Sequence, residues 1–127
     1  MSLIRHPILC VDGNGDICDM LALVLERENY ESKSAYSIRE AVALATAESF
    51  DLFIIEQEFA EGTGLALCKT LHAYTPASPI IFYSMNPDQP SRNEAKEAGA
   101  SARVTKGADI NELIDAVHTA LQSPQYW

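Results

Sequence analysis

Short apolar runs alternate along the chain with segments in which apolar residues recur every three or four positions. The short runs are typical of buried strands, and the periodic segments are typical of helices with one apolar face. The expected strands cover residues 8–11, 32–35, 51–55, 79–83 and 103–105. The expected helices cover about 16–29, 65–74 and 91–99, with two more opened at Ser37 and Asp109. Strand and helix therefore alternate five times.

Three of the expected helices begin with the same kind of polar pair. A Ser or Asp stands three positions before a Glu, which is the spacing of a capping box that satisfies the free N–H groups of a first helical turn. The pairs are Ser37 with Glu40, Ser91 with Glu94, and Asp109 with Glu112. They predict where these helices start.

The expected strand at 32–35 is weak, but the others read as apolar runs, which indicates that helices cover both faces of the sheet. Strands joined by such helices run parallel, and their crossover connections are right-handed. The pattern therefore predicts an α/β fold, a doubly wound sandwich with a parallel sheet in the middle. In such folds the functional site lies beyond the carboxyl ends of the strands.

The length of 127 residues suits one domain and leaves no room for a second core. No apolar run approaches the roughly 20 residues that span a bilayer, and no signal-peptide pattern opens the chain. Eighteen acidic residues against nine basic ones give a formal net charge of −9. This charge disfavours direct contact with nucleic acid or with an anionic membrane, so the expected partner is a protein.

The three cysteines, Cys10, Cys18 and Cys68, are odd in number and lack the spacing of a metal site. They predict free thiols in a reducing, cytoplasmic location.

Two ligand motifs begin after the first expected strand, and neither is completed. Asp12 suits the start of a calcium loop, but Ile17 stands where that loop needs glycine. Gly13 and Gly15 begin a dinucleotide fingerprint, but Cys18 takes the place of its third glycine. We therefore expect neither calcium nor a dinucleotide.

Four polar residues stand at the carboxyl ends of the expected strands: Asp12, Glu56, Ser84 and Lys106. Two carboxylates, a hydroxyl and an ammonium would meet there at one edge of a parallel sheet. One interpretation is a binding site for an anion. The other is a buried ion pair of Lys106 with Asp12 or Glu56, in which Ser84 is a hydrogen-bonding neighbour. The residue types alone leave both interpretations open.

Several stretches around these residues match a known family. They are Ile8–Asp12, Phe50–Ile55, Gly64–Cys68, Pro79–Ser84, Glu97–Ala100 and Thr105–Lys106. Through them the chain resembles the receiver domain of bacterial two-component response regulators, from about Pro7 to Leu121. The resemblance implies a flavodoxin-like (βα)5 fold with a five-stranded parallel sheet in the order 2-1-3-4-5. It also implies a single domain over 1–127, with a core at about 7–121 and a tail or the start of a linker at 122–127.

In that family, an aspartate that ends the third strand takes a phosphoryl group from a histidine of the partner kinase. Two acidic residues at the end of the first strand help hold Mg²⁺. A Thr or Ser ends the fourth strand and a Lys ends the fifth, and both contact the phosphoryl group. Asp12, Ser84 and Lys106 match these positions residue by residue.

Four positions depart from the family pattern. Glu56 stands at the phosphoacceptor position, and Gly13 replaces the second metal-binding acid. Arg103 stands at the position of the switch aromatic, and Gly107 replaces the usual proline after the lysine. Glu58 also lines the site in this family, so we expect it to compensate in part for Gly13.

These departures predict that ordinary phosphorylation is absent or very poor. Glu is longer than Asp by one methylene, roughly 1.5 Å of C–C bond, and phosphoryl transfer depends on positioning. Asp12 and Glu56 are left to bind Mg²⁺ weakly or not at all. We expect the Glu56 carboxylate to meet Lys106 and Ser84 directly. It would then imitate a phosphorylated aspartate and hold the domain in one conformation.

The resemblance implies a signalling module of a phosphorelay and not an enzyme. The expected partners are a sensor histidine kinase or phosphotransfer domain, which would contact the first helix beside Asp12, and an attached output domain or second receiver. A homodimer is also compatible with the fold. The alternative function is a phosphate-independent protein-interaction adaptor with the same fold.

Overall fold

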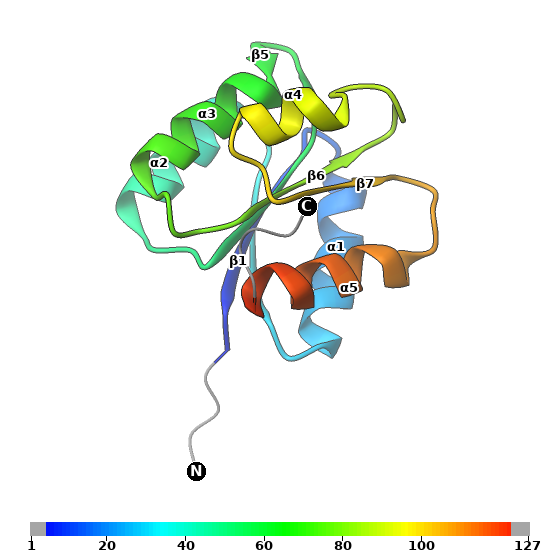
Figure 1. Cartoon of the computed structure of the whole chain (residues 1–127). Helices are drawn as coiled ribbons and strands as arrows, with labels where there is room; N and C mark the ends of the chain where they lie inside the picture. The colour runs from blue at the N-terminus through cyan, green and yellow to red at the C-terminus, as the bar shows by residue number, and fades with distance from the viewer. Residues whose placement is uncertain (1–4, 123–127) are drawn as a thin grey trace.

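The computed structural model describes residues 5–122 as a five-stranded parallel sheet between two layers of helices (Figure 1). The sheet consists of β1 (Pro7–Val11), β2 (Glu31–Ala35), β3 (Leu52–Ile55), β6 (Ile80–Ser84) and β7 (Ala102–Thr105). The helices are α1 (Gly15–Arg27), α2 (Ile38–Ala47), α3 (Gly64–Tyr74), α4 (Arg92–Glu97) and α5 (Ile110–Gln122). The predicted tail after Gln122 lies outside the described residues.

The strand order is β2-β1-β3-β6-β7, and all four pairings are parallel. For the five strands of this sheet, taken in chain order, this is the predicted order 2-1-3-4-5. Val11 pairs with both Ala35 and Ile55, and Ser84 pairs with Thr105. The strands therefore end close to one line, which brings the residues that follow them to the same edge.

Each face of the sheet carries its own apolar core. Leu9, Phe53 and Phe82 point to the side covered by α2, α3 and α4. Ile8 and Ile54 point to the other side, which α1 and α5 cover. Because successive side chains of a strand face opposite sides, burial on both faces requires a continuously apolar run. β3 and β6 are fully buried for this reason, whereas the edge strand β2 has exposed and half-buried residues up to Ala35.

A short hairpin precedes α3 where the sequence indicates only a loop. Its strands are β4 (Glu58–Phe59) and β5 (Gly62–Thr63), paired antiparallel. Two-residue strands carry no periodicity, so pattern analysis does not detect them.

Of the three predicted capping boxes, only one is complete. Ser91 and Glu94 form the reciprocal capping box. Ser37 accepts from the Glu40 N–H, but the Glu40 carboxylate accepts from the Tyr36 N–H instead of the Ser37 N–H. That second box is therefore only half formed. At α5 the Asp109 side chain accepts from the Asn111 N–H at 2.9 Å, and the Glu112 N–H donates to the Asp109 carbonyl instead of to its side chain.

The three cysteines are free and buried. Burial raises the pKa of the Cys10 and Cys68 thiols to about 12. Both remain protonated near neutral pH and pack as small apolar groups. Among residues 5–122, no helix combines the length and apolar character needed to cross a membrane.

Replacing Gly99 with alanine is expected to destabilise the fold more than the same change at Gly107 or Gly15. Gly99 has φ +102°, and an added Cβ would lie 2.5 Å from the His72 ring. Gly107 has φ +91° but open space, and Gly15 has open space and no left-handed backbone. We expect losses of more than about 2 kcal/mol for G99A, about 1 kcal/mol for G107A and close to none for G15A. Urea unfolding measures the free energy of unfolding of all three variants. Equal losses would contradict the steric role of Gly99 beside His72.

Candidate functional site

The carboxyl edge of the sheet brings the four predicted site residues together. Asp12 follows β1, Glu56 follows β3, Ser84 ends β6 and Lys106 follows β7. A cavity of about 650 Å³ opens over them. It is lined by Asp12, Gly13, Asn14, Glu56, Glu58, Ser84, Met85, Asn86 and Lys106.

The Lys106 ammonium lies between two carboxylates. Its Nζ donates to Asp12 Oδ2 at 2.6 Å and to Glu56 Oε2 at 2.5 Å. The exposed fractions of the side chains are 8% for Lys106 and Asp12 and 11% for Glu56. The alternative of a buried ion pair is therefore realised with both acids at once.

The remaining carboxylate oxygens are also occupied. Asp12 Oδ1 accepts from the Asn14 N–H at 2.9 Å, and Glu56 Oε1 accepts from the Gln57 N–H at 2.6 Å. All four carboxylate oxygens thus have donors from the chain itself. Buried charges persist in a protein only when they are paired and hydrogen-bonded in this way.

The environment shifts the pKa of Lys106 in two opposing ways. Burial acts to lower the pKa of the ammonium. The hydrogen bonds to Asp12 and Glu56, together with their charges, act in the other direction and raise it above its ordinary value. Lys106 is therefore firmly protonated near neutral pH. The three groups together carry one net negative charge.

The backbone of Glu56 is packed against the start of α3. A Cβ added at Gly64 would lie 2.1 Å from the Glu56 carbonyl oxygen, so only glycine allows this approach. The Gly64 N–H donates to the Gln57 carbonyl at 2.7 Å. The buried Gln57 side chain accepts from the Leu65 N–H at 3.0 Å. Gln57 was not predicted as a site residue, because its only signal in the sequence is that of a polar residue shortly after a buried strand.

The expected contact between Glu56 and Ser84 is wrong. Ser84 Oγ donates to the Gln89 carbonyl at 2.8 Å, within the loop that follows β6. Among residues 5–122, no hydrogen bond joins Ser84 to Glu56. The Ser84 hydroxyl thus bonds to the backbone of the loop and not to the carboxylate.

The residues present do not fit a resident Mg²⁺. Gly13 supplies no carboxylate, and the two carboxylates at the site already bind the ammonium. In the described part of the chain, no group of three or more His, Cys, Asp and Glu residues is placed to hold a metal ion. Glu58 is exposed and lines the cavity. Mg²⁺ needs oxygen ligands that are free to bind it, and here they would first have to release Lys106.

Arg103 lies on β7, at the predicted position of the switch aromatic. Its guanidinium is half-buried and donates to backbone carbonyls of the loop after β6, at Asn86 and Pro90. Gly107 has φ +91°, a value that proline cannot adopt. The backbone after Lys106 therefore differs from the proline-containing pattern.

Comparisons with known proteins agree with this geometry. Residues 8–118 match the family model described as "Response regulator receiver domain". The chain is 30% identical over 118 residues to the response regulator protein PilR of Pseudomonas aeruginosa. That match covers 93% of the chain and 26% of PilR, so the chain spans about a quarter of this curated relative.

Solved structures show the same fold. A two-component response regulator from Clostridium difficile aligns with a TM-score of 0.86 at 28% identity, over 94% of this chain and 98% of that one. A CheY-like receiver domain protein from Methanospirillum hungatei aligns with a TM-score of 0.88 at 24% identity, over 94% and 95%. With the sheet order and the match over residues 8–118 in agreement, the chain belongs to the response regulator receiver domain family.

Proposed function

We propose that the chain is a cytoplasmic receiver-type module of a two-component phosphorelay that is not phosphorylated in the ordinary way. The observation that carries this proposal is the Lys106 ammonium shared between Asp12 and Glu56. The group that would pair with an incoming phosphoryl group is already neutralised by two side chains of the protein.

Phosphoryl transfer to Glu56 is disfavoured by the same contacts. A nucleophilic oxygen must approach the phosphorus in line, and the transition state is stabilised by positioned positive charge. Glu56 Oε1 accepts from the Gln57 N–H, and Oε2 accepts from Lys106. Each oxygen therefore has a donor bound to it, which withdraws electron density and makes the oxygen a weaker nucleophile.

The Glu56 carboxylate partly replaces the charge of a phosphoryl group. It supplies −1 to Lys106, whereas a phosphorylated side chain carries about −1.5 to −2 at neutral pH. The ion pair of Glu56 with Lys106 is permanent because its formation requires neither a phosphoryl donor nor a metal ion. In this proposal, the domain therefore stays in one signalling conformation.

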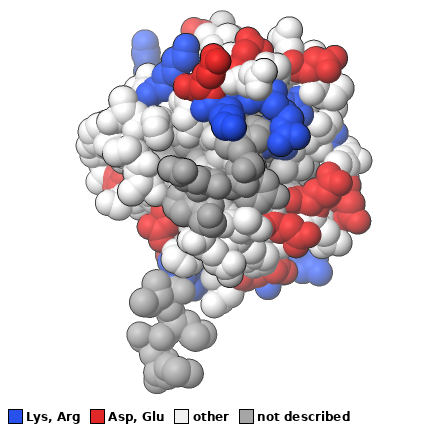
Figure 2. Space-filling model, in the orientation of Figure 1, with Lys and Arg blue, Asp and Glu red and all other residues white. Residues whose placement is uncertain are grey.

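The proposed partners follow from the family. A sensor histidine kinase or phosphotransfer domain would bind next to Asp12 and α1, where Leu23 is 66% exposed. An output domain, a second receiver or a second copy of the chain would use the face formed by α4, β7 and α5. Both signs of charge occupy the side of the molecule in Figure 2, with Lys and Arg gathered in its upper half and acidic residues at its upper rim and right edge. Such a surface suits a protein partner better than nucleic acid.

A phosphate-independent adaptor is the second candidate function. The Ser84 contact favours it, because the hydroxyl that would bind a phosphoryl group is directed to the Gln89 carbonyl instead. The two candidates differ in whether the rest of the phosphorylation machinery still works.

The first test is treatment of the chain with acetyl phosphate and Mg²⁺, followed by mass spectrometry of the intact protein. We expect no phosphoryl adduct, because both Glu56 oxygens accept hydrogen bonds and the part of the chain that the structure describes holds no group of three ligands for a metal ion. A clear adduct on Glu56 would refute the proposal.

The matched comparison is the double variant G13D/E56D. A Cβ at position 13 would lie 3.7 Å from the nearest atom, the Tyr36 carbonyl oxygen, so the added acid has room. We expect this variant to gain Mg²⁺ binding and a phosphoryl adduct, which supports an altered receiver. If it gains neither, the site has lost more than these two residues, and the adaptor is favoured.

Replacing Lys106 with methionine is expected to destabilise the fold by about 3 kcal/mol at neutral pH, because two buried carboxylates are left without their cation. K33M is the control, since Lys33 pairs with Glu48 at 2.6 Å on the surface and should contribute less than about 1 kcal/mol. Equal losses for the two variants in urea unfolding would contradict the buried network.

The raised pKa of Lys106 also predicts how its contribution to stability changes at alkaline pH. A group whose pKa is higher in the folded state stabilises the fold fully below its unfolded value, and this contribution is lost as the pH rises through the folded value. For Lys106 the loss begins above 10.5. The difference in unfolding free energy between the native chain and K106M should therefore shrink above that pH. A difference in unfolding free energy that stays constant above this pH would contradict the raised pKa of Lys106.

A further inference from the structure

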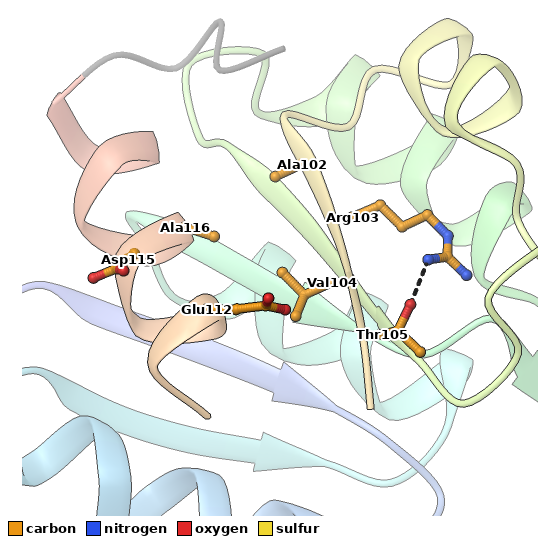
Figure 3. A pocket seen from close by; sticks show the side chains of 7 residues that line it. All are labelled: Ala102, Arg103, Val104, Thr105, Glu112, Asp115 and Ala116. Atoms are coloured by element: carbon orange, nitrogen blue, oxygen red, sulfur yellow. Dashed lines mark hydrogen bonds between the residues drawn. The ribbon is translucent and has the colours of Figure 1, made fainter. Parts of the chain in front are cut away.

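The guanidinium of Arg103 binds the loop between β6 and α4, residues 85–91, at two backbone carbonyls. Nε donates to the Pro90 carbonyl at 2.6 Å, and Nη2 donates to the Asn86 carbonyl. Nη1 donates to Thr105 Oγ1 at 3.0 Å, so the third nitrogen is held on β7 itself (Figure 3). Three nitrogens of one planar group have three different acceptors, which fixes the orientation of the group.

The same loop is also held from within. Ser84 Oγ donates to the Gln89 carbonyl at 2.8 Å, and the Gln89 N–H donates to the Asn86 carbonyl at 3.3 Å. The Asp88 N–H donates to Asn86 Oδ1 at 2.8 Å. The Asn86 carbonyl therefore accepts from both Gln89 and Arg103, which joins the internal bonds of the loop to β7.

The charge of Arg103 strengthens these contacts. Burial acts to lower the pKa of the guanidinium, and the negative charges of Asp88 and Glu56 oppose that effect. An arginine remains protonated under these conditions. Hydrogen bonds from an ionised donor are about twice as strong as neutral ones.

The alternation of β7 separates two sets of contacts. Arg103 and Thr105 extend to one side of the strand, while Ala102 and Val104 point towards α5 (Figure 3). Lys106, directly after the strand, reaches the carboxylates at the site. Within residues 5–122, no hydrogen bond connects the 85–91 loop to the side chains of Asp12, Glu56 or Lys106. The two cations thus hold different parts of the protein.

We propose that Arg103 is a positioning residue that holds the 85–91 loop, and with it the start of α4, in one conformation that does not depend on the state of residue 56. The inference rests on the proposed function, in which the domain has a fixed signalling conformation. Arg103 would hold the loop, whereas Lys106 would pair with the carboxylates at the site.

Amide hydrogen exchange on the whole chain tests this. The informative amides are Asp88, Gln89 and Ser91, which report local opening of the loop. R103M should accelerate their exchange about tenfold or more, because charged hydrogen bonds to two carbonyls are lost. E56Q should leave them within about twofold of the native rates. Unchanged exchange in R103M, or equal acceleration in E56Q, would overturn the proposal.

Two further variants separate positioning from general stability. R39M removes an exposed arginine of α2 and should leave the loop amides unchanged. R103K keeps the charge but cannot reach three separate acceptors with a planar fork, so its exchange rates should lie between those of the native chain and R103M. Native rates in R103K would show that charge alone suffices, against the three-point contact. If R103M does not fold, the comparison of R103K with R39M decides.

The outcome is independent of the phosphorylation test. An adduct on Glu56 with acetyl phosphate would end the proposed function and leave the exchange comparison intact, because the exchange experiment contains no phosphodonor. Unchanged loop exchange in R103M would end the Arg103 inference and leave the ion pairs at the site as they are.

Discussion

The structure depends on one ammonium that lies between two buried carboxylates. Removing three charged groups from water is unfavourable unless each finds its opposite charge and each oxygen a donor. Lys106 satisfies that condition with Asp12 and Glu56, and two backbone N–H groups complete it. This arrangement requires β1, β3 and β7 to end at one edge, because a displacement of any of them would leave a charge unpaired.

Seen from this network, the departures from the family pattern reinforce one another. Glu56 reaches Lys106 through its longer side chain, and Gly13 adds no second acid that would compete for the ammonium. Arg103 donates to two backbone carbonyls of the neighbouring loop, and neither acceptor belongs to a titratable side chain. In the family, the lysine at this site pairs with an incoming phosphoryl group. Here the Lys106 ammonium is already paired with two carboxylates of the protein itself.

The sequence was sufficient for the central strands, because an apolar run followed by a polar residue marks both a buried strand and the edge where it ends. The polar edge strand β2 has only a weak signal of this kind. The strand-end pattern placed Asp12, Glu56, Ser84 and Lys106 together. It could not give the direction of the Ser84 hydroxyl, which rotates freely and takes the nearest carbonyl with room to accept. It also could not find Gln57, because a buried side chain that caps a helix has the same letter as a loop residue.

Gly64 has a mechanical effect on this arrangement. With no Cβ at this position, the first turn of α3 rests directly on the peptide of Glu56, and the Gln57 side chain ties the two together. The peptide of residue 56 and the first turn of α3 are therefore in direct contact, without an intervening side chain. A side chain at position 64 would push the helix away from the site, so the position of α3 and that of residue 56 are set together.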